Sequence, residues 1–158
     1  MSELGEILWS HFKTRLPAST MVLYAYDHVD DSIVSVYEAG KEGCHVGTTR
    51  IPLGERLSGW VAATGQAVVN SDARLDLDEP ARDQSPLRTA LAAPVTSNGR
   101  SIGVLSFYAC EPGAFDDAQR RLVVTAGLVL APTMTEIADR GLRGECDVQH
   151  NSTRVLRN

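Results

Sequence analysis

Hydrophobic residues recur at two different spacings along the chain, and these spacings predict where helices and strands lie. Near the start, five apolar residues stand three or four positions apart, which is the period of one helix face. They are Leu4, Ile7, Leu8, Phe12 and Leu16. We therefore expect an amphipathic helix over Leu4–Leu16. Pro17 ends it, because the residue before a proline avoids the helical conformation.

A second, longer helix is predicted over Asp117–Arg140. Asp116 is followed three residues later by Gln119, a variant of the capping box that marks a helix start. Pro132 removes one backbone hydrogen bond and is expected to kink this helix, and Gly141 is expected to end it. Its apolar side consists of Leu122, Val123, Ala126, Val129, Leu130, Met134 and Ile137.

Two pairs of short runs rich in β-branched and apolar residues predict two antiparallel hairpins. The first pair joins Thr20–Tyr26 to Ser32–Ala39 through a polar connection. The second joins Ala90–Val95 to Ile102–Phe107 around Asn98-Gly99. Asn-Gly is a strong hairpin signal, because both central residues of a type I′ turn need positive φ. Both runs of the second hairpin are apolar on both faces, so we expect it to form the centre of the sheet.

The middle of the chain predicts shorter elements beside one long loop. Arg50–Gly54 and Gln66–Asn70 are strand-like, and Leu57–Thr64 between them is expected to form a short helix that Ser58 can cap. Ser71–Pro86 is the least regular stretch, with room for a helical turn of its own. Connections of this length are uncommon in compact domains and often form lids or binding loops.

This order of elements predicts an α+β domain. Its antiparallel central sheet carries the two terminal helices on one face, and the short helix and the long loop lie over a pocket on the other face. We assign residues 1–141 to this domain. Residues 142–158 contain few apolar positions and no period, so they are expected to form a flexible tail or a linker toward an output domain.

Composition and charge exclude several classes of partner. The net charge is −5, and the 15 lysines and arginines form no basic stripe, so no nucleic acid is expected to bind. The longest apolar run, Leu122–Ala131, is about half of a membrane span, so no membrane contact is expected. The N-terminal stretch is acidic where a signal peptide is cationic, and three cysteines form no disulfide framework. These features predict a reducing, cytoplasmic location.

At this point the residues resemble a GAF domain. The match is spread over five separate blocks and covers roughly Leu4–Arg140, a spacing specific for this fold and for related PAS-like architecture rather than for a ligand. The matching positions are Ile51-Pro52-Leu53-Gly54, Leu57, Gly59-Trp60-Val61-Ala62, Thr64-Gly65, Val68, Asn70, Asp72, Leu87-Arg88, Leu91, Pro94-Val95, Gly103-Val104-Leu105-Ser106, Ala114-Phe115 and Gln119.

The resemblance implies a regulatory role. GAF domains occur in sensor kinases, phosphodiesterases, cyclases and transcription regulators, where they bind small molecules or act as dimerising relays, mostly without catalysis. Members that reduce free methionine sulfoxide use cysteines in and beside the binding loop, but Ser71–Pro86 contains none. The resemblance therefore implies no enzyme, and a redox enzyme that uses Cys44 or Cys110 is the less favoured alternative. An adjacent imidazolium lowers the pKa of a thiol, but sequence neighbours such as Cys44 and His45 usually point apart in an extended loop.

The sequence contains no complete binding motif for the cyclic nucleotides or bilins that some GAF domains bind. Cyclic-nucleotide-binding members carry an Asn-Lys pair and an acidic pair where this chain has Ala109-Cys110 and Gln119-Arg120. No cysteine or histidine directly follows Ser85-Pro86, where bilin-binding members attach their chromophore. The cofactor therefore stays unknown.

No metal site is expected either. The four histidines stand singly along the chain. The acidic residues of the long loop lack the glycine and terminal glutamate of a calcium loop, so we interpret them as a solvated acidic lid. They are Asp72, Asp76, Asp78, Glu79 and Asp83.

Seven residues are candidates for contact with an unidentified small molecule, chosen for their polar or aromatic side chains near the predicted pocket. They are Tyr24, Tyr26, Trp60, Asp72, Arg88, Ser106 and Tyr108. For each of them, a role as a core residue or loop anchor stays open. Strand alternation alone does not say which of them face the pocket.

The leading hypothesis is a non-catalytic, small-molecule-sensing GAF module of a multidomain signalling protein of bacterial type. The alternative is a degenerate module that only holds a dimer together, with its pocket filled by side chains. Val123, Leu130 and Ile137 repeat every seven residues, which predicts either a homodimer seam through the terminal helices or only a stripe buried against the sheet.

Overall fold

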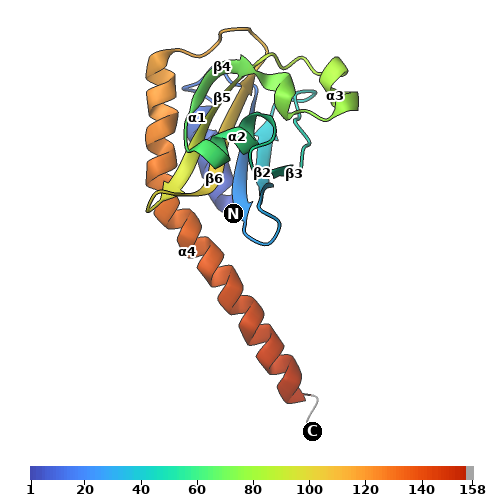
Figure 1. Cartoon of the computed structure of the whole chain (residues 1–158), viewed down its shortest axis with the longest axis vertical. Coiled ribbons are helices and arrows are strands. Elements are labelled where there is room, and N and C mark those ends of the chain that lie inside the picture. Colours follow the sequence, from blue (N-terminus) through green and yellow to red (C-terminus); the bar gives the residue numbers. More distant parts are fainter. Residues whose placement is uncertain (156–158) are drawn as a thin grey trace.

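The computed structural model describes residues 1–155, and side chains through residue 140. A six-stranded antiparallel sheet with strand order β3-β2-β1-β6-β5-β4 forms its centre (Figure 1). The strands are β1 (Thr20–Asp27), β2 (Ser32–Gly40), β3 (Arg50–Pro52), β4 (Val68–Asp72), β5 (Thr89–Ser97) and β6 (Arg100–Ala109). The helices are α1 (Ser2–Phe12), α2 (Arg56–Thr64), the 3₁₀ helix η1 (Ala73–Asp76), α3 (Glu79–Gln84) and α4 (Asp117–Val155).

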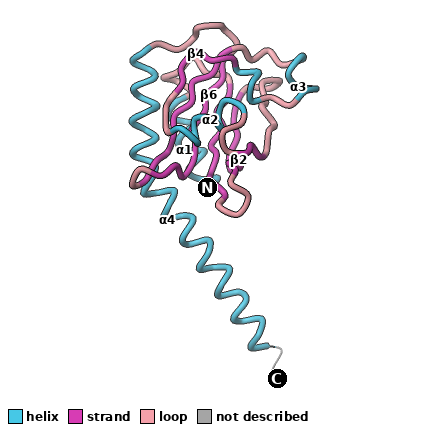
Figure 2. Tube along the Cα trace, viewed as in Figure 1, coloured by secondary structure: helices cyan, strands magenta, loops and turns pink. Residues whose placement is uncertain are grey.

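The sheet separates two apolar cores, and this confirms the predicted α+β layering. On one face, α1 and α4 pack on the odd-numbered positions of β1, including Met21 and Leu23. On the other face, α2 lies over the sheet (Figure 2), and Val22 and Tyr24 share a core there with residues of α2 and of the segment between β4 and β5. Strand alternation places neighbouring residues of β1 in opposite cores.

The Asn98-Gly99 turn has the predicted geometry. Asn98 has φ of 52° and Gly99 has φ of 75°, as a type I′ turn requires. However, the two central strands of the sheet are β1 and β6, and β5 lies one place further out. The prediction that the β5–β6 hairpin forms the centre is therefore right for β6 only. Hydrophobicity alone did not distinguish β5 from β1, which is also buried over its first half.

Helix α4 begins where the sequence predicts and ends later. Asp116 and Gln119 form the reciprocal capping box, with the Gln119 amide 2.7 Å from Asp116 Oδ1 and the Asp116 amide 2.9 Å from Gln119 Oε1. The predicted stop at Gly141 is wrong, because the backbone stays helical to Val155 and leaves the body of the domain (Figure 1). One glycine costs a helix only about 1 kcal/mol, which does not force an end. The boundary between a domain over 1–141 and a tail over 142–158 stays a prediction.

The predicted apolar side of α4 is only partly buried. The prediction is wrong for Leu122 and Val129, which are 37% and 70% exposed, while the other described core positions of the helix pack inside the domain. Val123 and Leu130, two residues of the predicted seven-residue repeat, are buried against the sheet side together with Met134. The buried-stripe interpretation therefore holds for these positions, and they cannot form a seam with a second chain. The stretch Asp117–Arg140 is long and apolar enough for a membrane span by length and composition alone. A core helix passes the same test, and several of its apolar residues have their partners inside this fold.

Helix α1 is shorter than predicted. It ends at Phe12, whereas the sequence predicts a helix through Leu16. Leu16 is nevertheless buried, because the turn after the helix folds it back into the same core as Leu8 and Phe12. The spacing of apolar residues therefore identified the core side chains correctly and misplaced the helix end by one turn.

Candidate functional site

A buried carboxylate stands at the centre of the α2 face. Asp76, the last residue of η1, is completely buried, and its Oδ1 accepts hydrogen bonds from the backbone amides of Leu57 and Ser58, each at 3.0 Å. These amides belong to the first turn of α2, where no intrahelical acceptor exists. The carboxylate thus caps α2 from a distant segment and lies at the positive end of the helix dipole. The expected cap by Ser58 itself is wrong, because Ser58 lies inside the first turn.

Hydroxyl groups complete the shell of Asp76. Ser58 Oγ and the Tyr108 hydroxyl both donate to Asp76 Oδ2 at 2.6 Å. Ser106 Oγ lies 2.8 Å from Ser58 Oγ, and the Tyr24 hydroxyl lies 3.4 Å from that of Tyr108. Because Ser58 and Tyr108 use their protons toward the carboxylate, Ser106 and Tyr24 donate to them in turn. The result is a directed chain of hydrogen bonds from β1 and β6 into η1 and α2.

This network lies between α2 and the sheet, the layer in which the sequence predicts a pocket. Tyr24, Ser106 and Tyr108 are all completely buried. Within the part of the chain whose side chains are described, no buried polar side-chain atom lacks a hydrogen-bond partner. A buried site for a polar ligand would contain donors or acceptors that have no partner within the protein. The groups around Asp76 instead satisfy one another, so we call them the Asp76 network and interpret it as a structural lock.

Burial and the carboxylate control the ionisation of the two tyrosines. Desolvation, followed by the charge of Asp76, raises the pKa of Tyr24 and of Tyr108 well above the ordinary value of about 10. Both hydroxyls therefore stay protonated in the folded protein at pH values where an unfolded chain loses these protons.

We expect folding stability to fall as the pH rises above about 10, the ordinary tyrosine pKa. Above that pH the unfolded state binds fewer protons than the native state, whereas well below it these two residues contribute no pH dependence. The measurement is tyrosinate ultraviolet absorbance and far-ultraviolet circular dichroism along an alkaline titration. Tyr24 and Tyr108 should ionise only as the helical signal is lost. Tyr26→Phe should remove absorbance only from the phase that precedes unfolding, and ionisation of all four tyrosines in the folded state would contradict the expectation.

The other four candidate residues lie apart from this network. The Tyr26 hydroxyl donates to Asp31 on the surface, and Trp60 points outward from α2 with 40% of its surface exposed. Asp72 caps η1 and pairs with Arg74 at 2.9 Å. Arg88 donates to the carbonyl oxygens of Ser85 and Leu87, at 2.6 and 2.8 Å, and so anchors its own loop. The structure brings three of the seven candidates together and leaves four dispersed.

Two members of the network were missed or misplaced by sequence reasoning. Asp76 was interpreted as part of a solvated acidic lid, and that is wrong for this residue because it is completely buried. Ser58 was considered only as a cap. The one local difference was that Leu75 and Leu77 flank Asp76 on both sides, where the other acids of the loop have at most one apolar neighbour. Within the described part of the chain, no cluster of histidine, cysteine or acidic residues could hold a metal ion.

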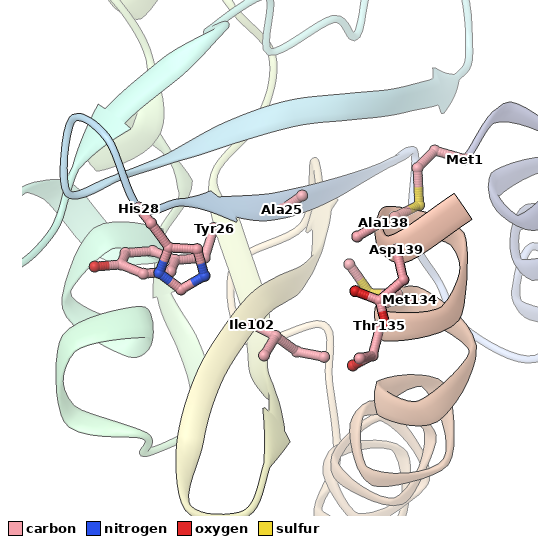
Figure 3. Close-up of a pocket in the computed structure, with 9 residues that line it drawn as sticks. All are labelled: Met1, Ala25, Tyr26, His28, Ile102, Met134, Thr135, Ala138 and Asp139. Carbon is pink, nitrogen blue, oxygen red and sulfur yellow. The ribbon is translucent and has the colours of Figure 1, made fainter. Parts of the chain in front are cut away.

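A cavity of about 220 Å³ lies on the opposite face, where β1 and β6 meet α4 (Figure 3). Ala25 and Ile102 line it from the strands, and Met134 and Ala138 line it from the helix. Tyr26 and His28 stand at its far side with their rings edge to face, 4.5 Å between centroids. The cavity is mainly apolar and touches both the sheet and the helix that leaves the domain.

Comparison with known proteins identifies the architecture. The family model described as "GAF domain" matches residues 1–132. The chain belongs to the GAF domain family. No curated protein sequence matches the chain.

Solved structures show the same fold in proteins of different function. This GAF domain is similar to the GAF domain of a phosphoenolpyruvate-protein phosphotransferase from Coxiella burnetii, with 22% identity, a TM-score of 0.75, and 89% of this chain and 85% of that chain covered. It is also similar to a free methionine-R-sulfoxide reductase from Neisseria meningitidis, with 25% identity, a TM-score of 0.67, and coverage of 89% and 78%. A type II free methionine-R-sulfoxide reductase from Thermoplasma acidophilum matches at 16% identity and a TM-score of 0.69, with coverage of 85% and 91%. The GAF fold therefore serves regulatory domains and reductases alike.

Proposed function

We propose that this GAF domain is a non-catalytic regulatory module of a signalling protein, with its α2-face interior closed by its own side chains and its output carried by α4. The observation that supports this most is the Asp76 network. Four donors surround one completely buried carboxylate, and each hydroxyl of the Asp76 network has a hydrogen-bond partner inside the domain. A substrate at this place would have to replace all of these bonds.

The terminal helices supply the proposed contact with a second copy. Ile7 of α1 is 62% exposed and Val129 of α4 is 70% exposed, whereas large apolar side chains of globular domains are mostly buried. Leu122 lies two turns before Val129 on the same side of α4. We propose a homodimer through this face, with α4 leading to an output domain. The acidic N-terminus and the unpatterned cysteines support a cytoplasmic location.

A second candidate function is the sensing of a small, largely apolar molecule in the cavity beside α4. What favours it is the position of the cavity: a ligand there would touch Ile102 on β6 and Met134 on α4 at once (Figure 3). Methionine side chains adapt to ligands of different shape. Binding there would bias how α4 packs on the sheet, which is the movement that a relay requires.

Oligomeric state and ligand screening test the two proposals separately. Light scattering should show a dimer, and Val129→Glu should convert it to a monomer that keeps the far-ultraviolet circular dichroism of the folded domain. Val29→Glu is the matched control, because Val29 is 90% exposed on the β1–β2 connection and belongs to neither helix. A monomeric wild type would refute the dimer.

Native mass spectrometry and a thermal-shift screen address the ligand. The screen covers cyclic nucleotides, amino acids, 2-oxo acids and aromatic compounds. Stabilisation that grows with ligand concentration and is lost in Met134→Asp would support the sensor. Turnover of free methionine sulfoxide that disappears in Cys110→Ser would overturn the non-catalytic role.

A further inference from the structure

Two cysteines far apart in the sequence lie side by side in the fold. Cys44 belongs to the loop between β2 and β3, and Cys110 directly follows β6. Two neighbouring residues hold them: Ser19 contacts the Cys110 thiol and Thr20 contacts the backbone of Cys44. Both are free, and both pack into the core on the α2 face, where Cys44 is 7% exposed and Cys110 is half-buried.

The start of β1 holds the two segments together. Thr20 pairs with Gly40 on β2 and with Tyr108 on β6. The segments that follow β2 and β6 therefore both begin beside Thr20. On one side, the Thr20 hydroxyl donates to the carbonyl oxygen of Cys44. On the other side, Ser19 Oγ lies 3.5 Å from Cys110 Sγ. The approach of the thiols therefore follows from the pairing of the central strands.

The loop that carries Cys44 is itself fixed. The Lys41 amide donates to the Ser19 carbonyl at 2.8 Å, and the Cys44 amide donates to the Lys41 carbonyl at 3.1 Å. These bonds turn the chain back over the beginning of β1 directly after β2 ends. Backbone hydrogen bonds thus hold Cys44 beside the beginning of β1.

We propose that Cys44 and Cys110 form a reversible intramolecular disulfide when the protein meets a low-molecular-weight disulfide such as oxidised glutathione. In the first step the Cys110 thiolate attacks one sulfur of the reagent, forms a mixed disulfide and releases one thiolate. In the second step Cys44, deprotonated, attacks Cys110 Sγ and releases the second thiolate. Two cysteine thiols are oxidised to one disulfide, the reagent is reduced to two thiols, and the two cysteine protons end on them.

The order of attack follows from exposure. Cys110 is the more accessible thiol, so it meets the reagent first. Cys44 is buried, and desolvation raises its pKa, so it acts as the resolving thiol from inside. The pair lies outside the Asp76 network, and its oxidation does not depend on the function proposed above.

The disulfide would connect the loop before β3 to the residue from which the chain turns toward α4. The ring that it closes contains β3, α2, β4, β5 and β6. Closing so long a ring restricts the unfolded chain strongly, so the oxidised protein should melt at a temperature higher by about 5 °C or more.

The test uses the full chain with Cys146→Ala, which leaves only the two cysteines of interest. The protein is incubated with oxidised glutathione, alkylated with N-ethylmaleimide and analysed by intact mass and non-reducing peptide mapping. We expect a product two hydrogen atoms lighter that carries neither glutathione nor maleimide, contains a Cys44–Cys110 cross-linked peptide and returns to the dithiol with dithiothreitol. Cys44→Ser in the same background should stop at the mixed disulfide on Cys110.

Three results would overturn the proposal, and none depends on how well Cys44→Ser folds. One is a glutathione adduct that persists on Cys110 while Cys44 is present and unmodified. The other is a disulfide between two chains in place of the internal one. An oxidised product with an unchanged melting temperature would also contradict it, because the long ring would then fail to restrict the unfolded state.

Discussion

Replacing Asp76 with alanine is expected to lower the free energy of unfolding by about 4 kcal/mol. The substitution leaves two backbone amides of α2, the Ser58 hydroxyl and the Tyr108 hydroxyl without their acceptor in a space that water does not reach. Each buried donor left unpaired costs about 1 to 3 kcal/mol, part of which local rearrangement recovers. Domains of this size are stable by only about 5 to 15 kcal/mol, so the loss is a large fraction of the total. Urea unfolding followed by circular dichroism measures it.

Asp83→Ala is the matched control, because Asp83 is an exposed acid in the same connection between β4 and β5. It should change the free energy of unfolding by no more than about 0.5 kcal/mol. Asp76→Asn should lower the free energy of unfolding by an amount between these two values. Its amide oxygen still accepts hydrogen bonds, but its NH₂ group cannot accept from the hydroxyls. A loss below about 1 kcal/mol in Asp76→Ala would contradict the structural lock, and the closed interior with it.

The second large effect is expected at Gly127, where α4 crosses β5. A Cβ atom on Gly127 would overlap the backbone carbonyl oxygen of Pro94, which cannot move without displacing the strand. Gly127→Leu should therefore force α4 away from the sheet and destabilise the domain by about 3 kcal/mol, net of a helix propensity gain of about 1 kcal/mol. Thermal and urea unfolding measure the loss, and increased proteolysis within α4 should accompany it.

Thr125→Leu places the same side chain two residues earlier on the exposed side of α4. This control should leave stability unchanged or slightly raised, because leucine favours the helix and an exposed position meets no close backbone of its own chain. If both variants lost the same stability, the close contact between α4 and β5 would not be the cause of the loss.

Local signals predicted the elements well because their physics is local. The Asn98-Gly99 turn and the Asp116–Gln119 capping box each depend on residues within four positions of one another, and both have the predicted geometry. The end of α4 was misplaced because a glycine weakens a helix without stopping it.

Neither the Asp76 network nor the cysteine pair could be predicted from the sequence, and the reason is the same for both. Asp76 is buried because η1 lies under the first turn of α2, and Cys44 meets Cys110 because β1 stands between β2 and β6. Both are consequences of tertiary packing, and residue type alone did not separate Asp76 from the exposed acids around it. Tyr24, Ser106 and Tyr108 were chosen as candidate ligand contacts. In the structure they hydrogen-bond to protein groups, and contact of these side chains with a ligand stays a prediction.

The position of β1 and β6 at the middle of the sheet also constrains how the chain folds as it is synthesised. These two strands stand near opposite ends of the domain and pair along their length, from Thr20 opposite Tyr108 to Ala25 opposite Gly103. Pairing strands so distant in sequence requires closure of a long loop before any contact offsets its entropy, which slows folding. On the ribosome, the β1–β2 hairpin must wait with one open edge until β6 has emerged. Helix α4, made last, is then the element that covers a sheet already complete.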